Sequence, residues 1–280
     1  MANFYHFTPI DTLISMLTDS LKVDKKTNQQ YIEFWATEIT ALNDTTERDL
    51  FVNVLINKVR QYATEQQNRL TEDQERDLGK LCYSDMYVIS LTSKDLSLSD
   101  ELNMWRGYGG NGCGVCLELD FSKIPPFYHT NTNIYQLEDS YILRECEYVK
   151  PEEIKIEQNL VKQIYESLNL TEKEKIKCTL IKASIMSHIA NLSPYYKHEA
   201  YKSEHEWRFV KHSLKEPKYR KRGNLLIPYI TYCIPITAIS SITIGPCLKD
   251  SDTIKSLTQF IERKLGPKFD IKFSNIPYRG

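Results

Sequence analysis

Apolar residues follow two different periods along the chain, and each period predicts one kind of element. Short runs rich in β-branched and aromatic residues predict strands at 4–7, 31–36, 86–93, 112–121, 141–149, 203–212 and 269–274. Apolar residues at helical spacing predict helices opening at Thr8-Pro9, at about 45–81 (two), at 101–108, at 151–192 (two) and at 251–264. Strands and helices in this order, with several strands gathered late in the chain, indicate an α+β fold.

The first helix is expected to begin directly after a short strand. Thr8 is predicted to cap it, with Pro9 at its first position, because a threonine oxygen accepts an amide hydrogen there and proline has none to donate. Its apolar face would consist of Ile10, Leu13, Ile14 and Leu17.

The segment 223–248 contains no charged residue and is long enough to raise the question of a membrane span. Pro228 and Pro235 interrupt it, and β-branched residues dominate both of its halves. We therefore expect two buried strands joined at Pro235, and no contact with a membrane. The N-terminal residues lack a basic region followed by a long apolar stretch, so the sequence predicts a cytoplasmic protein.

The composition is that of an ordinary globular protein. The 280 residues include 36 Lys and Arg against 37 Asp and Glu, which gives a formal net charge of −1. This balance excludes a surface coated with basic charge and a long acidic tail, but it does not exclude a local basic site. We expect a single domain over 1–280, in which the helical stretch 151–200 is an insertion.

The seven cysteines are scattered, and in a cytoplasmic protein they are expected to be reduced thiols. Cys113 and Cys116 have the spacing of a zinc-binding pair, but no second pair completes four ligands. In a strand, positions i and i+3 also point to opposite faces. We therefore predict that the protein binds no metal.

Residues 105–112 combine aromatic rings, an arginine and several glycines at a junction between a helix and a strand. Trp105 and Tyr108 offer flat rings, Arg106 offers a charge for a phosphate, and the glycines let the backbone approach a ligand closely. This composition suits a planar ligand that carries a phosphate. The alternative interpretation is a glycine-rich hairpin with a core tryptophan.

Two carboxylates lie close together in the segment 203–212. If the segment is a strand, alternation places Glu204, Glu206 and Arg208 on one face. Neighbouring carboxylates repel each other unless water or a ligand lies over them. The pattern therefore indicates either a ligand site or a solvated edge of the sheet.

The segment Lys211–Arg222 carries seven basic residues, counting His212, against one glutamate. Pro217 and Tyr219 within it indicate a loop that directly follows the strand containing Glu206. Beside an active cleft, such a loop would contact the phosphates of RNA or DNA. The alternative is a loop whose charges are only solvated.

Seven segments of the chain, taken in order, resemble a bacterial family known mainly as a domain of unknown function. They are FYHFTPIDTLISML, ALNDTTE, VISLTS with LNMWRGY, GVCLELD, SEHEWRFV, ITIGP and the terminal S-x-IPYR. The similarity covers nearly the full length, and the helical stretch at about 151–200 matches least well. That family in turn resembles the ADP-ribosyltransferase superfamily.

The resemblance implies a split β-sandwich-like core with helical insertions, and a site that binds NAD. In that superfamily a His or Arg on the first strand binds the ribose on the adenine side, and His6 occupies the matching position, with Thr8 on the same wall. The block VISLTS with LNMWRGY matches the strand, serine and tyrosine of the superfamily. Tyr108 would then stack on nicotinamide, with Ser90 nearby.

The resemblance also implies the catalytic carboxylates. Glu206 fits the late catalytic position, and Glu204 resembles the additional glutamate of the paired variant. A carboxylate bonded to the ribose 2′-hydroxyl would stabilise the positive charge that develops when the nicotinamide–ribose bond breaks. The second glutamate would orient or deprotonate the incoming nucleophile.

The remaining residues assigned to the NAD site are matched less directly. Asn43 and Asp44 belong to a block of the closer family whose role the superfamily does not define. Arg106 is the candidate for the pyrophosphate, from its residue type, and Trp105 beside it is placed in the same site.

These features lead to an expected function: transfer of ADP-ribose from NAD, without a metal, to a macromolecular acceptor. The acceptor would be nucleic acid or protein, and the basic loop favours nucleic acid. The resemblance further implies a toxin or phage-defence effector, with an antitoxin or regulator as partner. Two alternatives stay open: an NAD glycohydrolase with water as acceptor, and a non-catalytic module that senses NAD or a nucleotide or binds a protein.

Overall fold

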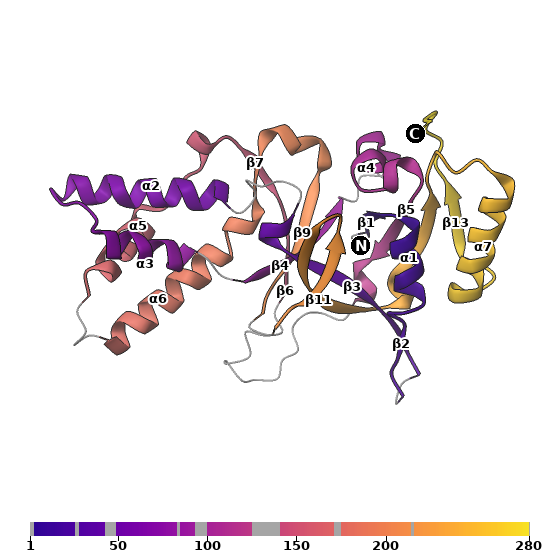
Figure 1. Ribbon diagram of the computed structural model, residues 1–280, viewed down its shortest axis with the longest axis horizontal. Coiled ribbons are helices and arrows are strands. Elements are labelled where there is room, and N and C mark those ends of the chain that lie inside the picture. The colour runs from indigo at the N-terminus through magenta and orange to yellow at the C-terminus, as the bar shows by residue number, and fades with distance from the viewer. Residues whose placement is uncertain are drawn as a thin grey trace.

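The computed structural model describes residues 3–25, 28–42, 49–82, 85–92, 100–124, 141–170, 175–213 and 216–279. Its central feature is a large, mostly antiparallel sheet in the middle of the molecule (Figure 1). A group of helices lies beyond one end of this sheet, and helix α7 (Ser251–Leu265) lies at the other end. The combination confirms the α+β class that the sequence predicts.

The main path of the sheet runs in the order β10, β11, β3, β4, β1, β5, β12 and β13, and β2, β6 and β9 join it at the side. Neighbouring strands are antiparallel, except for the parallel pair β12 and β13. Their bounds are β1 Asn3–Thr8, β2 Lys22–Val23, β3 Gln30–Glu38, β4 Met86–Thr92, β5 Val115–Asp120, β6 Tyr141–Glu145, β9 Glu206–His212, β10 Lys218–Arg222, β11 Leu225–Pro235, β12 Ile239–Ile244 and β13 Asp270–Phe273.

Strand β4 is the point at which the sheet divides. One edge of β4 pairs with β9 along its whole length. The other edge is shared, because β3 pairs with it at Tyr87 and Val88 and β1 pairs with it at Thr92. Two arms therefore leave the same edge of β4: β3, β11 and β10 form one, and β1, β5, β12 and β13 form the other. The space between the arms opens beside residues 89–91.

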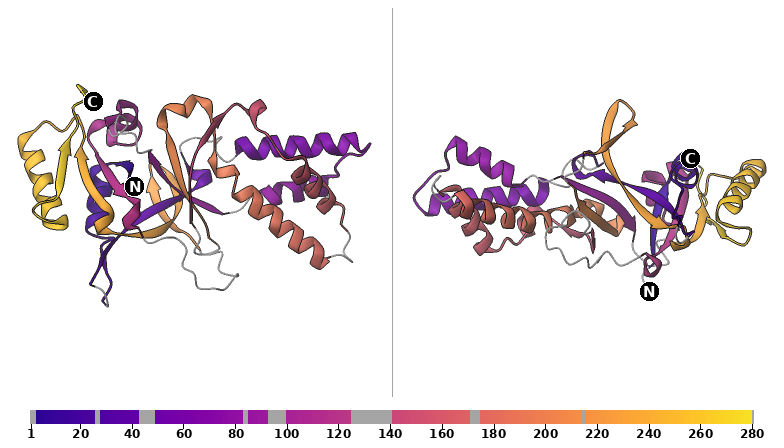
Figure 2. Two further views of the ribbon diagram at one scale, coloured as in Figure 1. Left: turned by 180° about the vertical axis from the view of Figure 1, so that it is seen from behind. Right: turned by 90° about the horizontal axis from the view of Figure 1, so that it is seen from below.

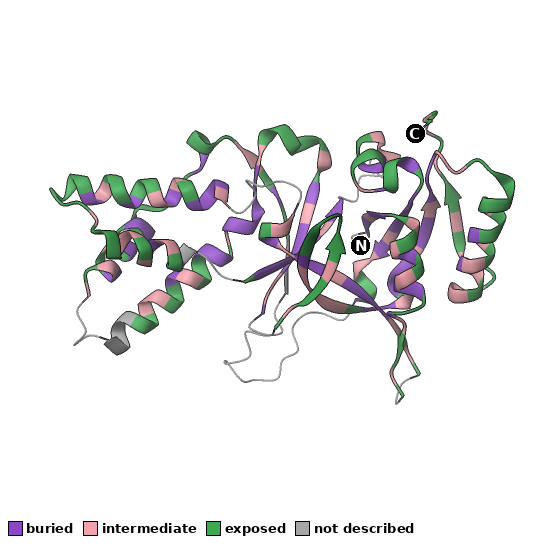
Figure 3. Ribbon diagram, in the orientation of Figure 1, coloured by how far each residue is buried: buried purple, intermediate pink, exposed green. Residues whose placement is uncertain are grey.

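The largest apolar cluster lies on the sheet and holds the two arms together. It includes Leu117 of β5 and Ile242 of β12, both fully buried, and Phe34 of β3 and Phe209 of β9. Helix α1 (Ile10–Leu17) contributes Leu13 and Leu17 to the same cluster. α7 contributes Leu257 and Ile261, so that the buried residues follow the strands and the inward faces of these helices (Figure 3).

A second apolar cluster belongs to the group of helices. α2 (Asp49–Glu65), α3 (Glu72–Cys82), α5 (Gln158–Leu168) and α6 (Lys175–Ala190) pack together there, and Leu55 and Ile164 are fully buried between them. We call these four helices the helical lobe. Figure 2 shows from two further sides that the lobe extends away from the sheet. Two short parallel strands, β7 (Glu147–Val149) and β8 (Tyr196–His198), lie where the chain passes between the lobe and the sheet.

The expected insertion at 151–200 is therefore only half of a larger unit. Its helices α5 and α6 do not stand alone, because the earlier helices α2 and α3 share their apolar cluster. Their amphipathic patterns could indicate an unpartnered face but not which helices would cover it.

Several expected boundaries are wrong, for local reasons. Thr8 does not cap α1, because it is the last residue of β1 and pairs with Val115; Pro9 is the residue at the cap and has no side-chain oxygen to offer. The expected strand at 141–149 is two strands, β6 and β7, separated at Cys146. The basic segment expected as a loop contains strand β10, which forms a hairpin with β11.

The strand expected at 203–212 begins only at Glu206. Residues Glu199–Glu204 form a 3₁₀ helix, and His205 follows it with a left-handed backbone, φ 46°. Glu204 and Glu206 therefore do not alternate along one strand as expected.

The uncharged segment forms strands β11 and β12, joined by a turn of 3₁₀ helix at Ile236–Ala238 after Pro235, as the sequence predicts. None of the described helices combines the length and the apolar character needed to cross a membrane.

Candidate functional site

A cleft of about 630 Å³ lies between the two arms of the sheet. This volume lies within the range of pockets that bind cofactors and other small molecules. Its walls come from β1, α1, β3, β4, β10 and the segments around Tyr108 and Lys197. The lining residues are His6, Phe7, Thr8, Pro9, Thr12, Met16, Glu33, Phe34, Trp35, Thr37, Leu42, Val88, Ile89, Ser90, Gly107, Tyr108, Lys197, Tyr201, Glu206, Arg220, Lys221 and Arg222.

His6 lies on β1, with its ring near that of Phe34 and its Nδ1 atom 3.1 Å from the carbonyl oxygen of Ser90. A carbonyl can only accept, so this contact requires a proton on Nδ1 and leaves Nε2 of the neutral ring as an acceptor. Burial is the main cause that lowers the pKa of His6. The hydrogen bond to Ser90 raises this pKa, and the charge of Arg220 lowers it further. The ring is therefore neutral at pH 7 and offers Nε2 to a donor such as a hydroxyl.

Four charged side chains form a buried cluster at one end of the cleft. Lys197 Nζ donates to Glu204 Oε2 at 2.5 Å and to Glu206 Oε2 at 2.7 Å. Arg208 donates from Nε to Glu206 Oε1 at 3.0 Å and from Nη2 to Glu206 Oε2 at 3.1 Å. A further Arg208 nitrogen, Nη1, donates to the carbonyl oxygen of Pro194 at 2.6 Å. Two cations thus balance two carboxylates, as charges removed from water require.

The surroundings of Glu206 keep it ionised. Burial raises its pKa, but the charges and hydrogen bonds of Arg208 and Lys197 outweigh burial and hold the pKa of Glu206 well below its ordinary value. Only 5% of Glu206 is exposed, yet the residue lines the cleft. Glu206 is therefore a fixed negative charge at the wall of the cleft, suited to stabilising a cation and unsuited to holding a proton.

Two tyrosines hold the glutamates in place. The hydroxyl of Tyr108 donates to Glu204 Oε1 at 2.9 Å, and the hydroxyl of Tyr148 accepts the backbone N–H of Glu206 at 2.7 Å. Burial raises the pKa of both tyrosines, and the Glu204 charge raises that of Tyr108 further. Both hydroxyls therefore stay protonated, and Tyr108 remains a donor to Glu204 at every physiological pH.

A smaller cavity of about 60 Å³ adjoins the cleft and shares some of its lining residues. Tyr108, Glu204, Glu206, His6 and Ser90 all line it. Glu204, which does not line the larger cleft, faces the same residues here. The two glutamates, the tyrosine and the histidine therefore surround a common space, although they come from distant parts of the chain.

Arg220 on β10 forms the opposite wall of the cleft. Its guanidinium lies over the ring of Trp35, 5.2 Å from Cζ to the ring centroid, and Nη2 donates to Thr37 Oγ1 at 2.8 Å. Its Nε is buried and has no hydrogen-bond partner within the part of the chain that the structure describes. Burial and the nearby charge of Arg222 lower the pKa of Arg220, as expected for a cation without a counter-charge.

The structure brings together most, but not all, of the residues assigned to the site from the sequence. His6, Thr8, Ser90, Tyr108 and Glu206 line the cleft, and Glu204 adjoins it. Asn43 and Asp44 lie outside the described residues.

Trp105 and Arg106 lie elsewhere. Trp105 belongs to α4 (Leu102–Gly107) and is fully buried, with its ring against Phe7 and its Nε1 donating to Asp100 at 2.8 Å, so it is a core residue. Arg106 is exposed, and its guanidinium lies over the ring of Tyr278, 4.9 Å from the centroid. Neither side chain lines the cleft, so the structure does not place Trp105 and Arg106 with the other residues assigned to the NAD site.

Three further residues line the cleft although the sequence pattern does not assign them to the site: Lys197, Trp35 and Arg220. Arg220 belongs to the basic segment that the sequence singles out, which is a partial signal. Lys197 has none, because a lone lysine is almost always exposed and nothing local predicts its burial between two glutamates.

No group of three or more metal-ligating side chains gathers anywhere in the described residues. Cys116 is buried, and burial raises the pKa of its thiol well above the ordinary value, whereas Cys113 is exposed. The two lie in different surroundings, but not for the expected reason, because Cys113 precedes β5 and only Cys116 lies on that strand.

Residues 104–209 match the family model described as a protein of unknown function (DUF2971). No curated protein and no solved structure matches the chain. The matched segment contains Tyr108, Lys197, both glutamates and Arg208, while His6 and Arg220 lie outside it. The expected similarity to a family of unknown function, which covers nearly the full length in the sequence analysis, is thus confirmed over residues 104–209.

Proposed function

We propose that the protein is an NAD-dependent ADP-ribosyltransferase, and that the cleft between the two arms of the sheet is its active site. The observation that carries the proposal is the convergence of His6, Ser90, Tyr108 and Glu206, from four separate segments, on one cleft. A resemblance in sequence does not by itself require these segments to meet. A sheet that divides at β4 also agrees with the split core that the resemblance implies.

Each residue then has a task that its surroundings support. The ring of Tyr108 would stack on nicotinamide while its hydroxyl is held by Glu204. Nε2 of His6 would accept a hydrogen bond from a hydroxyl of the adenine-side ribose, with Thr8 on the same wall. The cleft is large enough for a dinucleotide, whereas the smaller cavity beside it is not.

Glu206 would act as an electrostatic catalyst. When the bond between nicotinamide and C1′ of ribose breaks, its electron pair leaves with nicotinamide and the sugar becomes positively charged. A carboxylate that is already ionised and fixed by Arg208 and Lys197 stabilises that charge without having to reorganise. A hydrogen bond from the ribose 2′-hydroxyl to Glu206 would hold the positively charged sugar next to this carboxylate.

Glu204 would serve the second half of the reaction. The acceptor attacks C1′ and must lose a proton, and Glu204 is the carboxylate beside Glu206 that can orient the acceptor or take that proton. If water takes the place of the acceptor, the same arrangement gives an NAD glycohydrolase.

The proposal is tested by incubating the purified protein with NAD labelled in the ADP-ribose part, with and without cell lysate. Release of nicotinamide together with label in macromolecules is the expected result, and Glu206→Gln and His6→Ala should reduce both. Digestion of the labelled product with nuclease or protease then identifies the acceptor. Release without transfer would replace the transferase with a hydrolase, and NAD binding without release would point to a sensor.

A further inference from the structure

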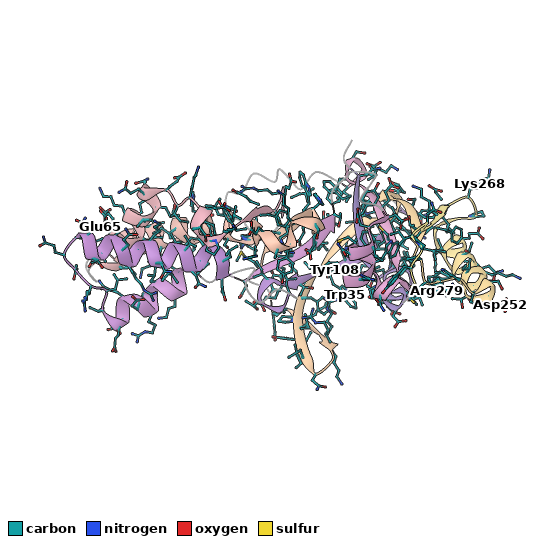
Figure 4. All side chains as sticks on the ribbon, turned by 90° about the horizontal axis from the view of Figure 1, so that it is seen from above. Trp35, Glu65, Tyr108, Asp252, Lys268 and Arg279 are labelled. Atoms are coloured by element: carbon teal, nitrogen blue, oxygen red, sulfur yellow. The ribbon has the colours of Figure 1, made fainter. Side chains whose placement is uncertain are left out.

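The hairpin of β10 and β11 projects from the body of the molecule beside the cleft. Its projection is clear in the right-hand view of Figure 2 and again in Figure 4. The five residues of β10 are Lys218, Tyr219, Arg220, Lys221 and Arg222, so four of them are cationic and none is acidic. All of them except Arg220 are exposed. A projecting strand with this composition presents positive charge to a partner rather than to the core.

Arg220 is the innermost of these cations, because the other residues of β10 are exposed. No carboxylate of the described residues is paired with it, and its buried Nε has no partner. Glu33 also lines the cleft, but Lys22 already forms an ion pair with it. A buried N–H donor without an acceptor is costly unless an acceptor arrives from outside. A phosphate oxygen is the acceptor whose charge and geometry match it.

Aromatic rings lie directly beside this guanidinium. Trp35 and Tyr229 are neighbours, with ring centroids 5.0 Å apart, and the Arg220 guanidinium lies over both. Trp35 lines the cleft and is only partly buried, so part of its surface remains open. Further out, Tyr219 is 57% exposed. Cations interleaved with rings in this way are typical of surfaces that bind single-stranded nucleic acid, because the phosphates meet the cations and the bases stack on the rings.

The hairpin is continuous with the candidate active site. Arg220, Lys221 and Arg222 line the same cleft as Glu206 and Tyr108. Trp35 and Tyr108, both labelled in Figure 4, also line this cleft. A strand that lies along the hairpin therefore reaches the same cleft as Glu206. A single strand can turn a base into this space, whereas a base within a duplex is held in its stack.

We propose that the β10–β11 hairpin and the Trp35–Arg220 wall of the cleft bind single-stranded nucleic acid. Only one part of this proposal rests on the proposed transferase function, namely that the bound strand is the acceptor of ADP-ribose. The binding of the strand itself needs no NAD. In the transfer, a nucleophilic atom of a base or sugar forms a bond to C1′ as the bond to nicotinamide breaks, and the proton of the nucleophile passes to Glu204.

The binding is tested without NAD, by fluorescence anisotropy with labelled DNA and RNA single strands of about 12 nucleotides. Arg220→Gln should weaken binding about five- to tenfold near 0.1 M salt and reduce the salt slope by about 1. Arg220→Lys should keep the slope and lose part of the affinity, because it keeps the charge but not the planar donor. Trp35→Leu should weaken binding about 5- to 150-fold at an unchanged slope.

The matched control is Arg263→Gln, because Arg263 is an exposed arginine on α7, away from the cleft. It should bind as the wild type does, and thermal unfolding checks that every variant is folded. If Arg220→Gln and Trp35→Leu bind as Arg263→Gln does, the proposal is overturned. It is also overturned if a duplex of the same sequence binds as tightly as the single strand.

Two further results separate this proposal from the proposed function. Binding of a single strand by a protein that does not cleave NAD supports the binding site and overturns the transferase. Cleavage of NAD by a protein that binds no strand overturns the binding site alone. If Arg220→Gln instead weakens NAD binding and leaves the strand bound, Arg220 serves the pyrophosphate of NAD and the proposal fails.

Discussion

Lys197 lies between the carboxylates of Glu204 and Glu206, and only 1% of it is exposed. Without its charge, two carboxylates would share one buried space with Arg208 as their nearest cation. Since like charges at this separation cannot both stay ionised at low cost, the lysine decides the protonation of the pair. It acts through the glutamates and is therefore a positioning residue.

Replacing Lys197 with Met should lower the free energy of unfolding by about 3–5 kcal/mol at pH 7, because it leaves a buried carboxylate without its partner. The double variant Lys197→Met with Glu204→Gln should regain part of this loss, since it removes the second charge as well. Urea unfolding of the three proteins measures both values. A double variant no more stable than Lys197→Met would show that charge is not the cause.

The same variant should change the dependence of stability on pH. The pKa of Glu206 is below its ordinary value of 4.5 in the folded protein, so its ion pairs stabilise the fold above that pH and are lost as the pH falls through the folded pKa. Lys197→Met raises the folded pKa of Glu206, and the loss of stability should then begin at a higher pH. Unfolding measured between about pH 3 and 7 tests the direction. Parallel curves for the two proteins would contradict it.

His6 should contribute a dependence of the same sign as Glu206, at a higher pH. Its pKa is lowered in the folded protein, so below about pH 6.5 the unfolded chain takes up a proton that the native ring resists. The free energy of unfolding should therefore decrease as the pH is lowered through this range, by at most about 1.4 kcal/mol per pH unit for this group. His6→Asn should flatten the curve, and His212, whose pKa is also lowered, supplies the comparison through His212→Asn. Equal slopes for wild type and His6→Asn would show that His6 is not held neutral by the fold.

Residue type alone predicts part of the site. A motif can point to the two glutamates, Tyr108 and His6, because the residue type alone shows which functional group each one offers. Trp105 shows the limit, because an aromatic residue in a glycine-rich segment serves the core as readily as a ligand, and only its burial decides. Arg106 and Arg220 are both arginines near glycines or other cations in the sequence, yet only the fold tells which one lines the cleft.

At the scale of elements, local patterns predict β1, β3, β4 and α7 well, because each has an apolar period that its own packing satisfies. The end of a 3₁₀ helix at His205 is not predicted, since its left-handed backbone depends on what surrounds Glu204. The division of the sheet at β4 is also beyond local patterns. It depends on pairing with β1, β3 and β9, which are far from β4 in sequence or belong to different arms.

Gly114 is a place where two elements of the site come too close for any larger residue. A Cβ atom there would lie 2.4 Å from the carbonyl oxygen of Thr8 and 2.7 Å from that of Gly109. Gly114→Ala should therefore destabilise the protein by about 1–3 kcal/mol and displace the end of β1 beside the cleft. Gly79→Ala in α3 is the matched control, because its Cβ would meet no atom within 4 Å, and it should stabilise the helix by up to about 1 kcal/mol. Urea midpoints of the two variants should move in opposite directions, and a shift of both in one direction would contradict the account.

At the scale of the whole molecule, the protein has two principal apolar clusters, one on the sheet and one in the helical lobe. The sheet cluster supports the walls of the cleft, while most of the lobe lies away from it (Figure 1). Composition predicts that a chain of this length can bury a sizeable core, but not that the core is divided or that α2 and α3 join α5 and α6.

Separate clusters should open separately. Leu55→Ala in the lobe and Leu117→Ala in the sheet each remove a fully buried side chain and should cost about 2–5 kcal/mol. In hydrogen exchange, Leu55→Ala should accelerate amides of α2, α3, α5 and α6 more than those of β5 and β12. Equal acceleration in both regions would show that the lobe and the sheet unfold as one unit.

The central claim, that the cleft cleaves NAD with Glu206 as its fixed charge, is tested most directly by the steady-state release of nicotinamide from NAD by Glu206→Gln. Because the amide keeps the shape of the side chain and loses its charge, kcat should fall about 100- to 1000-fold while KM changes little. Glu118→Gln, which changes a glutamate of β5 outside the cleft, should release nicotinamide at the wild-type rate. Release by Glu206→Gln at the wild-type rate would contradict the claim.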